Sequence, residues 1–166
     1  EKENIMTLNL SSEMVRGGTV CLGKAGLVEG TNAHTLAIVA ADGTAFINYA
    51  INGILYVKAD ADNIAMTALA QQAELTSCLY LCTLNAGGDL AITKGTERLT
   101  ADVTAGKYVL EWPKPADDTC PIGGFRVDLD EGYTFTCGTT DMAAVEANGT
   151  DTYYDFFAVP DTPITS

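Results

Sequence analysis

The sequence has little positive charge, little histidine and no long apolar run. Its 166 residues include 22 acidic and 9 basic side chains and one histidine, for a net charge of −13. A nucleic-acid binding protein needs a basic face that displaces counterions from phosphates, so this composition argues against nucleic acid as a partner. No apolar run reaches the roughly 18 residues of a membrane helix, so we expect no membrane span. The acidity favours repulsion between copies in solution; docking onto a basic protein surface is the alternative.

Motifs for catalysis, nucleotide binding and metal binding are also missing. No GxxxxGK[ST] or GxGxxG stretch occurs, and His34 lies in GTNAHT without a nucleophile elbow. The acidic stretches 59–63 and 128–132 resemble calcium loops, but neither completes the D-x-D-x-D-G pattern. Adjacent acids such as Asp117-Asp118 lie in turns, where Asp suits the turn geometry. We therefore expect no enzyme, no cofactor and no bound metal.

The five cysteines cannot all pair within one chain, and they lack the paired CxxC spacing of zinc sites. We expect buried thiols in a protein that folds in a reducing cytoplasm. A bridge between two of them, Cys120 and Cys137, is the alternative. The cysteines are Cys21, Cys78, Cys82, Cys120 and Cys137.

The clearest structural signal is the run FINYAINGILYVK at 46–58. Asn52-Gly53 between two apolar runs predicts a two-residue type I′ turn, because both central residues must tolerate positive φ. Both faces of the resulting hairpin are largely apolar, so we expect it to lie between two layers, or between one layer and another subunit. The pairs on one face are Ile51–Ile54, Tyr49–Tyr56 and Ile47–Lys58. The other face carries Phe46, Asn48, Ala50, Leu55 and Val57.

Further short apolar or alternating runs predict strands along the rest of the chain. The stretch at 59–77 has helical spacing and is the one helix we expect. Many short strands with little helix predict an all-β fold, either a single β-sandwich or a jelly-roll-like barrel with at most one short helix. A late hairpin is expected in which Val127 lies opposite Phe135. The expected strands are at 19–30 (two short ones), 36–41, 79–84, 89–94, 107–112, 122–129, 133–137 and 151–160.

One domain with an arm is the expected organisation. Residues 1–18 are predicted to form an N-terminal arm or edge strand, because 5–10 alternates and Gly17-Gly18 ends the run. Residues 19–166 are predicted to form the β-sandwich domain, without an internal repeat or a dividing linker.

Aromatic side chains near the presumed ends of the sheets suggest a contact surface. Core packing is the default explanation for most of them. A subunit interface is the more specific explanation, because Tyr, Trp and Phe are enriched at interfaces. Together with the apolar residues of the arm, the candidate interface residues are Met6, Leu8, Leu10, Tyr49, Tyr56, Trp112, Tyr153, Tyr154 and Phe156.

The segment TCPIGGFRVDLDEGYTFTCGTTDMAAVEANGTDTYYDFF at 119–157 resembles the C-terminal part of small virion proteins of tailed bacteriophages. The Asn-Gly-Ile-Leu-Tyr run of the central hairpin and the stretches at 78–81 and 93–96 resemble the same family. The likeness therefore spans about residues 36–160. It implies a capsid decoration or head-fibre role and supplies no catalytic residues.

The resemblance implies a non-enzymatic virion structural protein that decorates or cements the capsid exterior after assembly in the host cytoplasm. Its partners would be further copies, with a homotrimer favoured, and the major capsid protein or another virion protein. Three alternatives stay open. One is a tail or receptor-binding component, one is an extracellular filament or adhesin subunit that donates residues 1–16 as a strand, and the last is a carbohydrate hydrolase.

Overall fold

The computed structural model describes residues 18–40 and 43–157. As predicted, the fold is all-β and sandwich-like with little helix: eleven strands form three sheets, and the described residues contain two short helices. The strands are β1 Val20–Cys21, β2 Leu27–Glu29, β3 Thr35–Ile38, β4 Phe46–Ile51, β5 Ile54–Ala59, β6 Ala61–Ala65, β7 Thr76–Leu84, β8 Leu90–Lys94, β9 Arg98–Leu99, β10 Cys120–Leu129 and β11 Gly149–Asp155. The helices are α2 Thr100–Thr104 and α3 Met142–Ala147.

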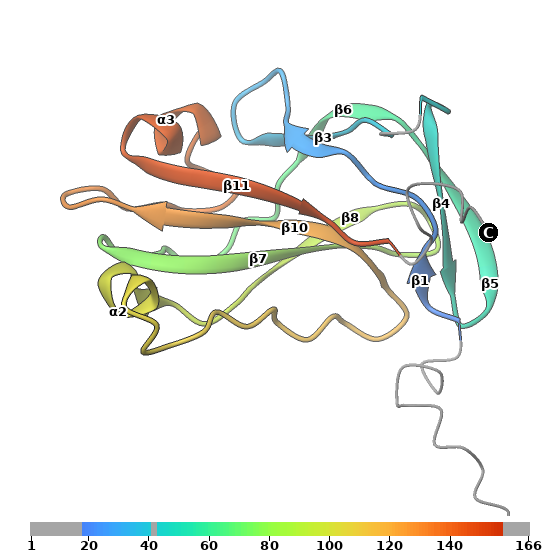
Figure 1. The fold of residues 1–166 in the computed structure, drawn as a ribbon. Helices are drawn as coiled ribbons and strands as arrows, with labels where there is room; N and C mark the ends of the chain where they lie inside the picture. The colour runs from blue at the N-terminus through green and yellow to red at the C-terminus, as the bar shows by residue number, and fades with distance from the viewer. Residues whose placement is uncertain (1–17, 41–42, 158–166) are drawn as a thin grey trace, which may run out of the picture.

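The largest sheet has five strands in the order β11-β10-β7-β8, with β9 also paired to β7. The hairpin of β4 and β5, together with β1, forms a second sheet that stands across one end of the long one, while α2 and α3 lie toward the opposite end (Figure 1). The third sheet, β2-β3-β6, covers the upper side in the same view. The molecule is thus elongated, and the β4–β5 hairpin covers one of its two ends.

Aromatic rings and one buried amide fill the core beside β7. Tyr80 stacks on Phe125 with ring centroids 4.9 Å apart and meets Phe135 edge-on at 5.5 Å. The fully buried Gln72 side chain donates to the carbonyls of Thr76 (2.9 Å) and Val127 (3.0 Å) and accepts from the Tyr80 hydroxyl (2.9 Å). The polar atoms of this buried network are therefore paired, as a low-dielectric interior requires.

The helix expected within 59–77 is wrong. Residues 61–65 are strand β6, which pairs with β3, and the chain then continues without helix to an isolated bridge between Gln72 and Phe135. Met66 is buried and Leu69 is partly buried, whereas Ala70 and Ala73 are exposed, so the apolar spacing does not mark one continuous buried face. The two helices lie elsewhere, at α2 and α3, where short Ala-containing segments follow a strand or a turn.

Two strand predictions in the second half are also wrong. The late hairpin does not form, because β10 pairs instead with β7 and with the distant β11, which places Phe125 opposite Tyr80 and Tyr153. Residues 133–137 are loop apart from the bridge at Phe135. Residues 107–112 are irregular chain whose Trp112 packs on Gly124, where a Cβ would lie 2.5 Å from the indole.

The central hairpin and the thiols are as predicted. The register pairs Ile51 with Ile54 and Tyr49 with Tyr56, and the turn residues Asn52 and Gly53 have φ of 52° and 81°. The hairpin of β7 and β8 also forms. All five cysteines are buried and free, so the alternative disulfide between Cys120 and Cys137 is wrong. Burial raises the pKa of Cys78 to about 11 and that of Cys137 to about 12.

Candidate functional site: the outer face of the β4–β5 hairpin

The β1-β4-β5 sheet turns one face toward the core of the protein. On this inner face Ile47, Tyr49 and Ile51 are buried, and the Tyr49 hydroxyl donates to the Asn85 carbonyl at 2.8 Å. Burial raises the pKa of Tyr49, with smaller contributions from nearby groups. Tyr56 stacks on Tyr49 at 5.6 Å and is half-buried. Tyr49, which the sequence suggested as an interface residue, is therefore a core residue.

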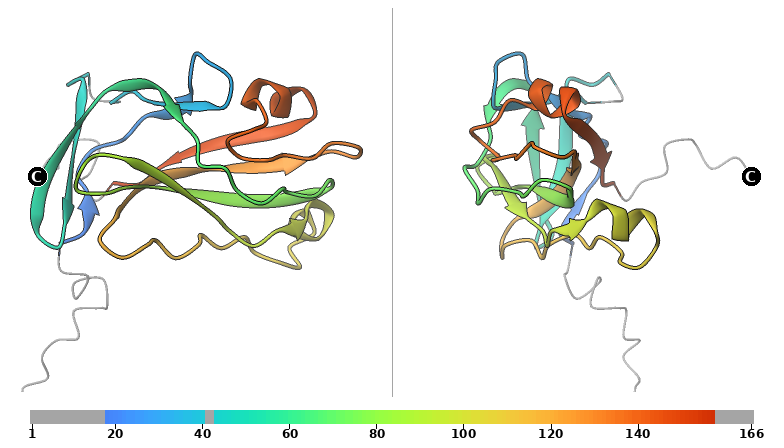
Figure 2. Two further views of the ribbon diagram at one scale, coloured as in Figure 1. Left: turned by 180° about the vertical axis from the view of Figure 1, so that it is seen from behind. Right: turned by 90° about the vertical axis from the view of Figure 1, so that its left-hand side faces the viewer.

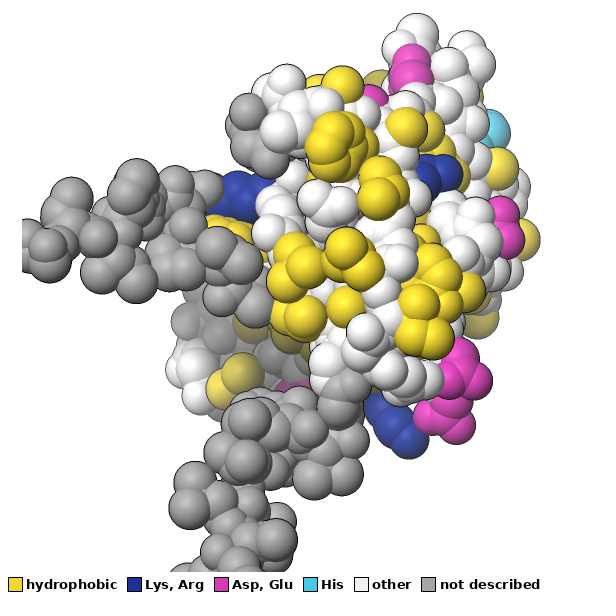
Figure 3. Space-filling model, turned by 90° about the vertical axis from the view of Figure 1, so that its right-hand side faces the viewer, with side chains coloured by type: hydrophobic (Ala, Val, Ile, Leu, Met, Phe, Trp, Pro, Cys, Tyr) yellow, Lys and Arg dark blue, Asp and Glu magenta, His cyan; other side chains and the backbone are white. Residues whose placement is uncertain are grey.

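The opposite face of this sheet is apolar and open. We call it the outer hairpin face; Figure 3 views this end of the molecule, and its yellow side chains gather over the hairpin. Phe46, Leu55 and Val57 expose 39%, 60% and 58% of their surface. The β-strand pairing also places Leu22 on this side, because its N–H donates to the Asn48 carbonyl. The face comprises Val20, Leu22, Phe46, Asn48, Ala50, Leu55, Val57 and Ala59.

No residue of the outer hairpin face is charged, although the chain carries 22 acidic side chains. Acidic side chains visible in Figure 3 lie toward the margin of the view. Depletion of charge around exposed aliphatic and aromatic residues is typical of the centre of a protein–protein interface. The outer hairpin face therefore has the composition of a contact surface.

Strand β5 also leaves a free edge. Within the described residues it pairs with β4 alone. Natural sheets protect such edges with proline, bulges or charged side chains. β5 has no proline, and its single charge, Lys58, is on the inner side, where its stem lies 3.5 Å from the position of a Cβ on Gly88. This edge is thus open to a further strand.

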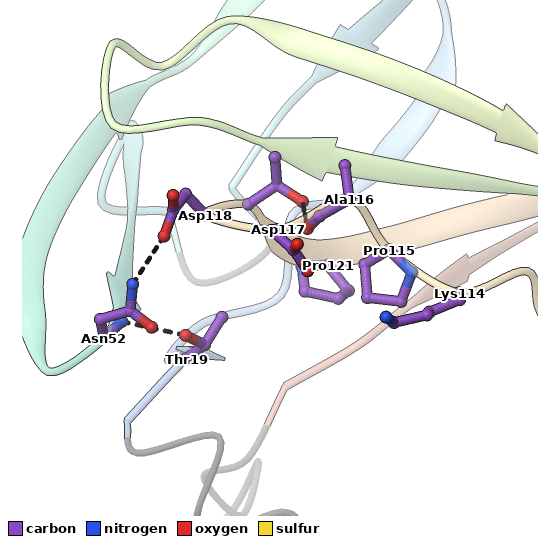
Figure 4. A pocket seen from close by; sticks show the side chains of 9 residues that line it. Thr19, Asn52, Lys114, Pro115, Ala116, Asp117, Asp118 and Pro121 are labelled. Carbon is purple, nitrogen blue, oxygen red and sulfur yellow. Dashed lines mark hydrogen bonds between the residues drawn. The ribbon is translucent and has the colours of Figure 1, made fainter.

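Polar contacts anchor the tip of the hairpin beside a hollow of about 350 Å³ (Figure 4). The Asn52 side chain donates to Asp118 at 2.8 Å, and its backbone N–H donates to the Thr19 hydroxyl at 2.9 Å. The Gly53 N–H donates to the Gly18 carbonyl at 3.2 Å. The chain therefore enters the described fold at the hairpin tip, on the β1 side of the sheet.

The other predicted interface aromatics belong to the long sheet and the chain that packs on it, not to the outer hairpin face. Trp112 meets Tyr154 and Phe156 edge-on at 5.7 and 4.9 Å on the outer side of the long sheet. They line an open groove of about 530 Å³ that also includes Arg126. Tyr153 points the other way, and its ring lies 5.9 Å from that of Phe125. The predicted Met6, Leu8 and Leu10 lie outside the described residues.

The acidic side chains at 59–63 accept hydrogen bonds from backbone N–H groups of other segments. The Asp60 carboxylate accepts the Ala40 N–H at 2.9 Å. Asp62 accepts the hydroxyl of Thr31 at 2.6 Å and its N–H at 3.0 Å, and these hydrogen bonds lower the pKa of Asp62. Across residues 18–40 and 43–157, no group of three or more His, Cys, Asp and Glu side chains is placed to hold a metal ion.

The chain matches no family model, no curated protein and no solved structure. In the part of the chain that the structure describes, neither helix has the length and apolarity to cross a membrane. Surface geometry is consequently the basis for inferring what this protein does. The residues that sequence reasoning missed as interface candidates are Leu55, Val57 and Phe46, although the alternation of the hairpin had already placed them on a shared face.

Proposed function

We propose that this chain is a non-enzymatic virion structural protein that decorates or cements the capsid exterior as an oligomer, with a homotrimer favoured. The outer hairpin face is the observation that supports it. An apolar surface without acidic side chains at the end of an elongated domain would be costly to leave in water, and covering it with another copy or with the shell recovers about 25 cal/mol for each Å² of apolar area.

The remaining character of the chain fits this role. Repulsion among copies with a net charge of −13 opposes unspecific clustering, so association is restricted to the neutral face. The virion role in this proposal comes from the resemblance of residues 119–157 to small phage virion proteins. A decorating protein needs no reacting groups, only a durable fold and a specific contact surface.

Electron microscopy of the parent virion tests the location. We expect the fold to fit density on the outside of the head, with the outer hairpin face against a neighbouring subunit. Density in the tail, or absence of the chain from the particle, would reject the decoration role.

Self-association is tested separately on the purified chain by light scattering after size exclusion. The double variant Leu55→Asp, Val57→Asp places two charges on the outer hairpin face and should reduce the oligomer to a monomer. The matched control Thr150→Asp, Thr152→Asp puts the same charges on exposed positions of β11 and should leave the mass unchanged. Equal masses for both double variants would contradict the proposed interface.

A tail or receptor-binding component is the second candidate, and the aromatic groove at Trp112 favours it. Exposed rings beside a few polar groups suit a ligand such as a glycan, and Tyr154, Arg126 and Asp155 provide both kinds of group there. A glycan array with the Tyr154→Ala variant as control distinguishes this candidate. Binding that disappears in the variant would favour receptor binding over decoration.

A further inference from the structure

The free edge of β5 offers backbone hydrogen bonds as well as apolar side chains. In an antiparallel pair, alternate residues direct their N–H and C=O groups away from the partner strand. Ile51 and Ile54 flank the two-residue turn as a hydrogen-bonded pair, so the outward groups of β5 belong to Leu55, Val57 and Ala59. Figure 2 shows β5 as the outermost strand of its sheet in the view from behind. The edge is therefore a template for one more strand.

A segment of this chain outside the described residues matches that template. The run IMTLNL at 5–10 has no charge, as is true of the outer hairpin face. Its six residues equal the length of β5, and its alternation places Met6, Leu8 and Leu10 on one side. Such a strand would continue the apolar surface of Leu55 and Val57 while it pairs with the open backbone.

The point at which the chain enters the fold places the arm near the β5 edge, and the proposed oligomer makes a neighbouring copy the acceptor. Gly18 is held at the hairpin tip on the β1 side, and β1 and β5 are opposite edges of the sheet. Gly18 also lies against Gly53, the residue that precedes β5, so the chain enters the fold close to the β5 edge. Extended chain spans about 3.3 Å per residue, so the connection between Leu10 and Gly18 can span up to roughly 25 Å, enough to reach a neighbouring copy.

We infer that residues 5–10 of one copy add to β5 of the next copy as a fourth strand of its β1-β4-β5 sheet. The inference rests on the proposed function in that both require copies to meet at this end of the molecule. Donor and acceptor surfaces differ, so the contact is head-to-tail. Such contacts close into a ring when the rotation permits and otherwise propagate as a filament. The favoured trimer is the closed form.

Two variants of the full chain separate donor from acceptor. Val57→Pro removes an outward N–H from β5 and retains the arm, and proline is tolerated on an edge strand. Leu8→Pro prevents the arm from pairing and retains the edge. The matched controls are Val57→Thr, which keeps the N–H, and Glu3→Pro, which lies outside the alternating run. Analytical ultracentrifugation gives the mass of each variant alone and of the equimolar mixture.

Each of the two proline variants should sediment as a monomer, while wild type and both controls form oligomers. Their mixture should form a one-to-one dimer, because the arm of Val57→Pro can enter the intact edge of Leu8→Pro. A mixture that stays monomeric, or proline variants that keep the wild-type mass, would overturn the inference. The experiment uses purified chain alone, so its outcome is independent of whether the protein is found on a capsid.

If Val57→Pro does not fold, amide hydrogen exchange in Leu8→Pro provides a second test. In Leu8→Pro the amides of Leu55 and Val57 should exchange at least about tenfold faster than in wild type, because they lose their partner strand. The amide of Tyr56, which faces β4, serves as the internal control and should not change. Equal exchange in both chains rejects strand donation. Slow exchange in a monomeric wild type would mean that the arm covers its own copy and would reject donation to a neighbour.

Discussion

Strands β7 and β5 are both rich in apolar residues, yet they differ in how far their side chains are buried. All nine residues of β7 are buried, because the five-stranded sheet is covered on both faces. In β5, Leu55 and Val57 remain 60% and 58% exposed. The apolar composition of a strand therefore does not tell whether the chain itself covers both of its faces. The chain covers β7 itself, and we propose that another copy or the capsid shell covers β5.

The largest expected difference between the two regions is in stability. Phe125→Ala empties space beside Tyr80 in the long sheet and should lower the free energy of unfolding by about 3–5 kcal/mol. Leu55→Ala removes an exposed side chain and should cost no more than about 0.5 kcal/mol in dilute, monomeric protein. Urea titration of both variants measures the two values. Similar costs would show that Leu55 is already buried in the monomer.

The buried amide of Gln72 tests how far the long sheet depends on satisfied polar groups. Gln72→Ala leaves the carbonyls of Thr76 and Val127 and the Tyr80 hydroxyl without this partner, at a cost of about 2–3 kcal/mol. The neighbouring Gln71 is exposed and bonds to Thr134, so Gln71→Ala should cost about 0.5 kcal/mol or less. Equal effects in urea titration would contradict a special role for Gln72.

Alkaline pH should weaken the core that contains the thiols. Burial raises the pKa of Cys78 to about 11 and that of Cys120 and Cys137 to about 12, from an ordinary value of 9.0. Above pH 9 the unfolded chain releases these protons while the folded chain retains them, so stability is full below pH 9 and falls as pH rises toward 11–12. Each thiol contributes about 1.4 kcal/mol per pH unit in that window.

Unfolding titrations at several pH values measure this slope. Cys137→Ala removes one of the five buried thiols whose pKa values burial raises, and it should make the fall above pH 9 shallower than in wild type, since each thiol contributes at most one proton. A slope unchanged in the variant would show that other groups cause the alkaline loss of stability.

The smallest predicted effect concerns the turn of the hairpin. Gly53 has φ of 81°, so Gly53→Ala should cost about 1 kcal/mol through left-handed strain. Gly23→Ala is the matched control, because a Cβ there meets nothing within 4 Å and the backbone has no positive φ. Thermal unfolding distinguishes them: a lower midpoint for Gly53→Ala alone is expected, and a loss in both would contradict the explanation.

Turn chemistry predicted the central hairpin correctly, whereas other segments were mispredicted because their partners are distant in the sequence. The turn at Asn52-Gly53 follows from two adjacent residues, and it was right. Val127 was expected opposite Phe135, eight positions away, but its partners are Cys78 and Asp151. The apolar spacing of 59–77 suits a helix as well as an extended chain, and the bridge from Gln72 to Phe135 favours the extended form.

The sequence predicted the two faces of the hairpin but not which of them would form the candidate site. Alternation placed Leu55 and Val57 together on one face of the hairpin and Tyr49 and Tyr56 on the other, and it indicated that both faces should be covered. Aromatic residues were then preferred as contacts, although Tyr49 is a core residue whose hydroxyl bonds to Asn85. Which face turned outward depended on the position of the long sheet.

The sequence by itself determined the β-rich fold, the turn of the central hairpin and the two sets of side chains that its strands separate, because φ preference and period-two alternation act over a few residues. Only the tertiary structure decided that the Tyr49 face is buried and the Leu55 face is open. The reason is physical: burial depends on which elements pack against a face, and the Tyr49 face packs against β10 and the turn that follows β7, which are remote in the chain.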